Sequence, residues 1–95
     1  MSSYLVVNAD IVDAEMLVKY SKAAGPTVAG RPLKAVVVSN EAEALEGTPA
    51  GKRVVIIEGP TREALLEWYN SPEYQAVIGM RLAATNGFAV IVDGL

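Results

Sequence analysis

The chain has 95 residues, enough for one domain with a modest hydrophobic core, and we expect a single domain over residues 1–95. Its net charge is −3 and its eight Lys and Arg residues are scattered, so the basic patch typical of nucleic-acid binding is absent. The absence of both Cys and His excludes disulfides, thiolate catalysis and the commonest metal ligands. We therefore expect no cofactor, and acid–base chemistry would have to use Asp, Glu, Lys or Tyr.

No apolar run approaches the ~20 residues of a membrane span, and the first ten residues do not resemble a signal peptide. We expect a cytoplasmic protein without a membrane or nucleic-acid partner. The hydrophobic content of 52% is nevertheless high for so small a domain, because a small domain has a relatively large surface. Part of this apolar content must be covered by something.

The first half of the chain predicts two strands around one helix. Residues 4–9 are apolar at nearly every position and predict a strand. Asp13 can cap the helix that follows, and Gly25-Pro26 ends or bends this helix. Residues 33–39 predict a second strand, and the polar residues 40–50 predict an irregular loop that contains Gly and Pro.

The second half predicts two strands around a broken helix. Thr61 can cap a helix that runs to about Tyr69, where Asn70-Ser71-Pro72 interrupts it. Ser71 can cap a new helix with Pro72 at its first position, and we expect this helix to end at about Asn86-Gly87. The two predicted strands cover residues 53–58 and 88–93.

The order β-α-β-β-α-β, with the second helix broken near Asn70–Pro72, is the split β-α-β pattern of ferredoxin-like α+β domains. It predicts a four-stranded antiparallel sheet with both helices on one face. An antiparallel sheet with one wet face should alternate apolar and polar residues, but these strands are apolar towards both faces. Because a single helix layer cannot cover both faces, we predict a homodimer that packs sheet on sheet.

Several segments carry a resemblance to a known family. The most specific is W-Y-N-S-P-E-Y at 68–74, and further matches are L-E-G at 45–47, the strand 54–58, Arg81 and V-D-G at 92–94. Over nearly its whole length the chain resembles the family called domain of unknown function 1330, in the dimeric α/β-barrel superfamily. The resemblance implies homodimers whose two sheets face each other. The superfamily includes cofactor-free oxygenases, isomerases and dehalogenating enzymes, many of which rely on a His that is missing here.

Two segments depart from the usual pattern of that family. Its members usually carry Arg-Gly-Gly on the second strand, whereas this chain reads Leu33-Lys34-Ala35-Val36. Their third strand usually ends in Glu-Phe-Pro, whereas here it ends in Glu58-Gly59-Pro60. A cleft that relies on the Arg of the second strand would therefore differ in charge in this protein.

Arg81 is the most informative candidate site residue. Helical spacing from Tyr74 to Leu82 places it at the centre of an apolar stripe, where an unpaired charge costs on the order of several kcal/mol. One reading is a structural ion pair with Glu58 or Glu46, and another is a bound carboxylate or phosphate of a ligand. A third is a guanidinium that reaches solvent.

Glu58 is the second candidate for a catalytic role. If the strand alternates regularly, Glu58 points the same way as Val54 and Ile56. Burial there would raise the pKa of its carboxyl and suit it to act as a general base. The alternative is a half-solvated carboxylate at the strand end that pairs with Arg81.

Aromatic and polar side chains complete the candidate set. Aromatic residues at helical spacing are usually core residues, but Tyr20, Trp68 and Tyr74 could also form a pocket wall. Asn8, the polar exception in the first strand, could bind a ligand or satisfy backbone groups near the strand end. The predicted ligand-binding residues are Asn8, Tyr20, Glu46, Trp68, Tyr74 and Arg81, with no metal site.

Two functions follow from these candidates. In the first, a small homodimeric protein binds a polar or anionic molecule in a cleft between helices and sheet, and could be a cofactor-independent enzyme that uses Glu58 and Arg81. In the second, the protein is a non-catalytic dimeric structural or interaction module whose Arg81 forms a structural ion pair. A pocket beside an Arg81 that lacks carboxylate partners favours the first function, and a closed, fully paired Arg81 favours the second.

Overall fold

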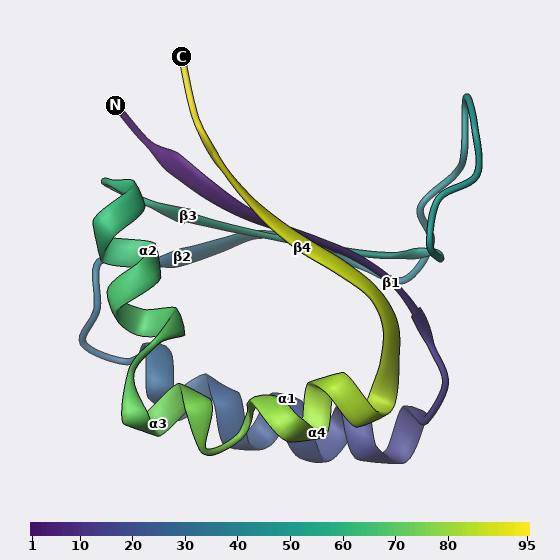
Figure 1. Cartoon of the computed structure of the whole chain (residues 1–95), viewed down its shortest axis with the longest axis horizontal. Coiled ribbons are helices and arrows are strands. Elements are labelled where there is room, and N and C mark those ends of the chain that lie inside the picture. Colours follow the sequence, from purple (N-terminus) through teal and green to yellow (C-terminus); the bar gives the residue numbers. More distant parts are fainter.

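One four-stranded antiparallel sheet and one layer of helices make up this computed structural model, which describes residues 1–95 (Figure 1). The strand order β2-β3-β1-β4 confirms the predicted ferredoxin-like α+β fold. The sheet stays open, with β2 and β4 at its edges, so one chain alone does not close a barrel. In chain order the elements are β1 (Ser3–Ile11), α1 (Ala14–Val28), β2 (Lys34–Ser39), β3 (Arg53–Gly59), α2 (Arg62–Tyr69), α3 (Pro72–Gln75), α4 (Ile78–Ala84) and β4 (Thr85–Asp93).

Three helices begin at the predicted capping residues. The side chains of Asp13, Thr61 and Ser71 each accept a hydrogen bond from the backbone N–H three residues later, at 3.0, 3.1 and 3.2 Å. Pro72 occupies the first position of α3, where its missing N–H leaves no helical hydrogen bond unmade. As the sequence predicts, one helix therefore ends before Asn70 and a new helix begins after the cap at Ser71.

The end of α1 differs from one predicted alternative. The helix continues past Gly25-Pro26 to Val28, so Pro26 lies inside its last turn. Two interactions hold this turn in place. Val28 packs against the hydrophobic core, and the Thr27 hydroxyl donates to the Ala24 carbonyl at 2.6 Å.

The predicted end of the last helix at Asn86-Gly87 is wrong. The helix that starts at Pro72 ends at Gln75, a separate helix α4 covers Ile78–Ala84, and Asn86-Gly87 lies within β4. Gly87 pairs with Ala9 of β1, and a side chain at position 87 would collide with the backbone of β1. This glycine serves the close approach of two strands rather than the end of a helix.

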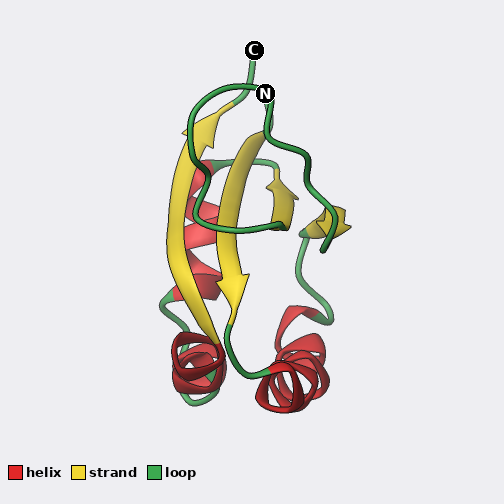
Figure 2. Cartoon of the chain, turned by 90° about the vertical axis from the view of Figure 1, so that its right-hand side faces the viewer, coloured by secondary structure: helices red, strands yellow, loops and turns green.

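The helices all lie on one side of the sheet. Seen from the end, α1 and α4 lie side by side beneath it (Figure 2). The other side, which we call the outer face, carries no helix (Figure 1). Its side chains alternate with those that face the helices and are Tyr4, Val6 and Asn8 of β1, Val54, Ile56 and Glu58 of β3, and Phe88, Val90 and Val92 of β4.

Edge strand β2 contains an irregularity. Ala35 pairs with Ile57 and Val37 pairs with the adjacent Ile56, so Val36 is the extra residue of a β-bulge. All residues from Lys34 to Val38 of this edge strand are exposed.

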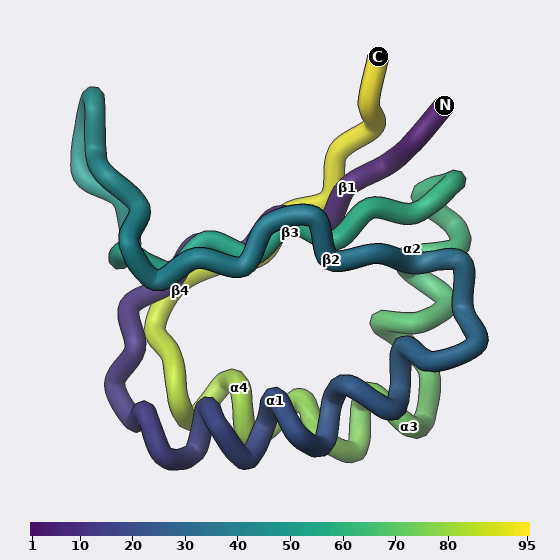
Figure 3. Tube along the Cα trace, turned by 180° about the vertical axis from the view of Figure 1, so that it is seen from behind, coloured from purple at the N-terminus to yellow at the C-terminus, as the bar shows by residue number.

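The loop between β2 and β3 is irregular, as predicted. We call residues Asn40–Lys52 the arm. The arm stands off the sheet on the side of the outer face, away from the helices (Figures 1 and 3). Its turn includes Gly47, whose φ of 71° is readily adopted only by glycine.

The hydrophobic core lies between the sheet and the helices. Its largest fully buried side chains are Trp68, Tyr74 and Leu65, of which Trp68 is 2% exposed. The indole N–H of Trp68 donates to the Thr27 hydroxyl at 3.0 Å and so links α2 to α1. None of the helices has the length and apolar character needed to cross a membrane.

Candidate functional site

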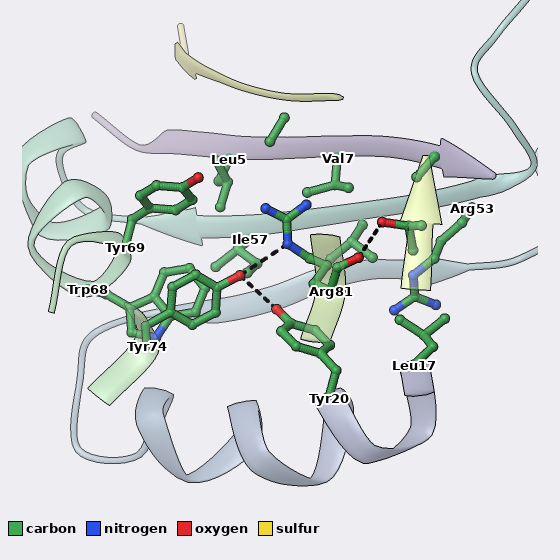
Figure 4. A pocket seen from close by; sticks show the side chains of 14 residues that line it. Leu5, Val7, Leu17, Tyr20, Arg53, Ile57, Trp68, Tyr69, Tyr74 and Arg81 are labelled. Carbon is green, nitrogen blue, oxygen red and sulfur yellow. Dashed lines mark hydrogen bonds between the residues drawn. The ribbon is translucent and has the colours of Figure 1, made fainter. Parts of the chain in front are cut away.

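An apolar pocket lies between the helix layer and the helix-facing side of the sheet (Figure 4). Its volume is about 50 Å³. At ~10–15 Å³ per water position, this is room for roughly three to five waters or for part of a small organic molecule. Fourteen residues line it: Leu5, Val7, Ala9, Leu17, Tyr20, Arg53, Val55, Ile57, Trp68, Tyr69, Tyr74, Arg81, Thr85 and Ala89.

Three polar side chains from α1, α3 and α4 meet in this pocket. The Arg81 Nε donates to the Tyr74 hydroxyl at 3.3 Å, and the hydroxyls of Tyr74 and Tyr20 are hydrogen-bonded at 2.8 Å (Figure 4). Burial, followed by the hydrogen bond to Tyr74, raises the pKa of Tyr20 well above its usual value. Tyr20 therefore stays a neutral phenol that can donate or accept a hydrogen bond but does not supply a base.

Arg81 has no carboxylate partner. Its side chain makes one hydrogen bond, through Nε, and the three ion pairs of the chain involve only Arg31 and Arg62 as cations. Figure 4 shows the terminal nitrogens of Arg81 pointing towards the sheet, near Leu5 and Val7. The guanidinium is partly exposed, and its terminal nitrogens, which make no hydrogen bond within the chain, border a largely apolar pocket.

Of the three readings of Arg81, the ion pair with Glu58 or Glu46 is wrong. Glu58 lies on the outer face, because it alternates with Ile57, which lines the pocket. There it accepts a hydrogen bond from the Tyr4 hydroxyl at 3.1 Å, and this bond, together with the negative charge of Glu58, raises the pKa of Tyr4. Glu46 is exposed on the arm. The two residues predicted to act together in catalysis, Glu58 and Arg81, are separated by the sheet.

Asn8 also lies on the outer face, where its side chain binds backbone groups. Its Nδ2 donates to the carbonyls of Gly51 and Arg53 at 2.9 and 3.0 Å. Its Oδ1 accepts from the Ala50 N–H at 2.9 Å. Of the two predicted roles for Asn8, the structure therefore supports the hydrogen bonding of backbone groups near the strand end. These bonds hold the base of the arm in place.

The three predicted aromatic residues combine both of their predicted roles. Trp68 and Tyr74 are core residues, with ring centroids 4.2 Å apart, and both also line the pocket. The ring of Tyr20 meets that of Tyr74 edge to face at a centroid distance of 6.3 Å. These aromatic rings hold the phenol groups in position beside Arg81.

Arg53 is a pocket residue that the sequence analysis missed. It enters from the start of β3, and its guanidinium donates to the Asn40 Oδ1 at 2.8 Å. The signal for it is the alternation of the strand, because Ile57 and Val55 line the pocket and the same step of two residues reaches Arg53.

The charges around the pocket are all positive. Two Arg residues line it and no Asp or Glu does, although the whole chain has a net charge of −3. Both arginines are only partly buried, so their positive charge favours an anion over a cation in the pocket while solvent screens part of the attraction. No group of three or more His, Cys, Asp or Glu side chains lies together as a metal site would require.

The strand order and a pocket enclosed between sheet and helices define a ferredoxin-like α+β domain. Within this class, the chain belongs to the family described as Domain of unknown function (DUF1330), which matches residues 2–95. This match confirms the resemblance seen in the W-Y-N-S-P-E-Y segment. No curated protein matches the sequence significantly.

Solved structures with the same fold differ widely from this chain in sequence. A protein of unknown function from Rhodopseudomonas palustris has 20% identity and a TM-score of 0.81, over 99% of this chain and 82% of that one. SnoaB, a cofactor-independent oxygenase from Streptomyces nogalater, has 10% identity and a TM-score of 0.69, over 99% and 93%. A dimeric ferredoxin-like protein of unknown function from Thermobifida fusca has 11% identity and a TM-score of 0.66, over 99% and 92%. At these identities the likeness shows the fold alone.

Proposed function

We propose that this protein binds a small organic anion in the pocket and that the guanidinium of Arg81 holds its anionic group. The observation that carries the proposal is the position of Arg81, a cation in the wall of a largely apolar pocket without a carboxylate partner. Its terminal nitrogens make no hydrogen bond within the chain, so they are free to form charge-assisted hydrogen bonds to a carboxylate or phosphate in the pocket.

The walls of the pocket suggest the shape of the ligand. Eleven of the fourteen lining residues are hydrophobic, so the ligand should carry an apolar body behind its anionic group. The phenols of Tyr20 and Tyr74 stand beside the guanidinium and can bind a second polar atom of the ligand. A small monocarboxylate with an aromatic or aliphatic body meets these requirements.

If the bound anion is a substrate, the protein is a cofactor-independent enzyme. The fold supports cofactor-independent oxygenation in SnoaB. In this chain, Arg81 would stabilise negative charge that develops on a bound substrate. The predicted use of Glu58 as base or acid is not part of this proposal, because Glu58 lies on the other face of the sheet from the pocket.

The alternative function, a non-catalytic module, depended on a structural ion pair of Arg81. Arg81 forms no ion pair within the chain, and a pocket opens beside it. By the criterion set from the sequence, these features favour ligand binding.

We also propose that two copies of the chain pack through their outer faces as a homodimer. On this face Phe88, Val90 and Val92 are 52%, 46% and 44% exposed. Monomeric proteins avoid contiguous apolar patches of this kind, and a second sheet is the simplest cover for a sheet. The description of the Thermobifida fusca protein as dimeric agrees with this proposal. A mass measurement in solution tests it, and a stable monomer at micromolar concentration would contradict it.

Ligand binding can be tested by thermal shift with a small set of probes. We would compare benzoate, hexanoate, acetate and inorganic phosphate with benzamide, the neutral analogue of benzoate. At about ten times its dissociation constant, a ligand adds ~1.4 kcal/mol of stability and raises the Tm by about 5–10 °C. We expect such a rise with benzoate or hexanoate and none with benzamide.

The variant Arg81→Ala should lose this rise, because it removes the group that binds the anion. Arg62→Ala is the matched control, since Arg62 is paired with Asp93 at 3.3 Å and lies outside the pocket. It should keep the rise relative to its own ligand-free Tm. Retention of the rise in Arg81→Ala would remove Arg81 from the binding role, and no rise with any probe in the wild type would contradict the proposed ligand class.

A further inference from the structure

The arm, Asn40–Lys52, makes few contacts with the subunit to which it belongs. It rises on the side of the outer face (Figures 1 and 3), and every residue from Glu43 to Ala50 is exposed. Leu45 is 90% exposed, the highest exposure of any large apolar side chain away from the chain ends. At this exposure, burial of Leu45 within its own subunit contributes almost nothing to the stability of the fold.

The base of the arm is nevertheless held firmly. Asn8 makes three hydrogen bonds to the backbone around Gly51, and Arg53 bonds to Asn40 across the base. The Ala42 N–H donates to the Lys52 carbonyl at 2.9 Å. The arm therefore leaves the sheet in a defined direction, with Leu45 beyond the bonded part.

The arm and the outer face form one concave surface. A groove between them is lined on the sheet side by Asn8, Val54 and Phe88 and on the arm side by residues 42–46 and 48–49. Whatever covers the outer face therefore also meets the arm.

We propose that the arm is a clasp between subunits, and that Leu45 of each subunit packs against the partner in the homodimer proposed above. This inference rests on that homodimer. The six residues from Glu41 to Glu46 can span up to ~20 Å at ~3.3 Å per residue. Packed sheets lie ~10 Å apart, so even a half-extended arm reaches the level of the partner's sheet. In a two-fold dimer the contact occurs twice, once from each arm.

The first test measures dimer dissociation by sedimentation equilibrium over a dilution series. Leu45→Ser should raise the dissociation constant of the dimer at least about tenfold, the effect expected for removing one well-buried leucine from an interface. Leu82→Ser is the matched control, because Leu82 is 61% exposed on α4, on the opposite side of the molecule from the outer face. It should leave the dissociation constant within about twofold of the wild type.

A second test uses the absence of cysteine from the chain. In Leu45→Cys the introduced thiol is unique, so it can carry a benzophenone photo-crosslinker. Dimers are assembled from equal amounts of ¹⁵N-labelled and unlabelled protein, and the cross-linked peptides are identified by mass spectrometry. Cross-links that join labelled to unlabelled peptides are expected.

The outcomes separate the two proposals. A wild-type dimer that is weakened by Leu45→Ser, with mixed-label cross-links, supports the clasp. A wild-type dimer that Leu45→Ser does not weaken, or cross-links confined to single subunits, overturns the clasp and leaves the dimer standing. A wild-type monomer overturns both.

Discussion

The two faces of the sheet are built from similar apolar residues but have different surroundings. On the face towards the helices, Leu5 and Val7 are each 8% exposed, whereas on the outer face Val90 and Val92 are 46% and 44% exposed. The first face is covered by the chain's own helices, and the second is covered by nothing within the chain (Figure 1).

This difference teaches that an apolar strand residue indicates a covered face without indicating what covers it. On the helix-facing side, substitutions should change the free energy of unfolding of the chain. On the outer face, substitutions should change association between chains and leave the fold of each chain largely intact. The following predictions test this division, starting with the largest effect.

Trp68→Ala should lower the free energy of unfolding by ~3–5 kcal/mol, because it leaves a large cavity in the core and removes the hydrogen bond to Thr27. Urea unfolding followed by circular dichroism measures the change. Leu66→Ala, on the same helix but 39% exposed, is the control and should cost about 1 kcal/mol or less. Similar losses in the two variants would contradict the assignment of the core to the helix-facing side.

Val90→Lys should raise the dimer dissociation constant at least about a hundredfold, because it buries a charge in the proposed sheet-to-sheet contact. The control Val18→Lys changes a residue on α1 that is 55% exposed, away from the outer face. Light scattering during size-exclusion chromatography should show monomers for the first variant and dimers for the second. Loss of folded structure in Val90→Lys, rather than loss of the dimer, would contradict the assignment of the outer face to association between chains.

The smallest expected effect concerns Asp93 at the end of β4, which links the sheet to α2. Hydrogen bonds from Arg62 and then Ser3 lower the pKa of Asp93. A lowered pKa in the folded state stabilises the fold above the unfolded pKa of about 3.9, and this stability is lost as the pH falls through the folded pKa. Because the group is exposed, the effect should be small.

The Tm of the wild type should therefore exceed that of Asp93→Asn at pH 6, and the difference should disappear by about pH 2. Thermal unfolding over this pH range measures it. An equal difference at both pH values would mean that the carboxylate charge is not the cause.

Local signals made most of the fold predictable from the sequence. The capping residues Asp13, Thr61 and Ser71 act within one helical turn, so their sequence positions fix the helix starts. The end of the last helix was not predictable in the same way. Asn86-Gly87 has the form of a local stop signal, but the close approach of β4 to β1 determines its structure.

The candidate site was predictable on the helices and not on the strands. Helical spacing singled out Tyr20, Trp68, Tyr74 and Arg81, and all four line the pocket, although the helix assumed from Tyr74 to Leu82 is broken between α3 and α4 and Leu82 is exposed. On β3 both faces are apolar, so the pattern does not tell which set of alternate residues faces the helices. The choice of Glu58 over Arg53 follows from this ambiguity, which only the packing of the helices resolves.

The bulge in β2 has a consequence for the behaviour of the protein at high concentration. Three consecutive valines, Val36–Val38, lie exposed on an edge strand, and such a segment can add strands from other molecules and begin a fibre. At Val36 the regular spacing of backbone hydrogen-bonding groups is interrupted, and Lys34 places a charge at the start of the strand. A straight incoming strand cannot match this edge along its whole length, so the irregularity protects the folded protein from aggregation.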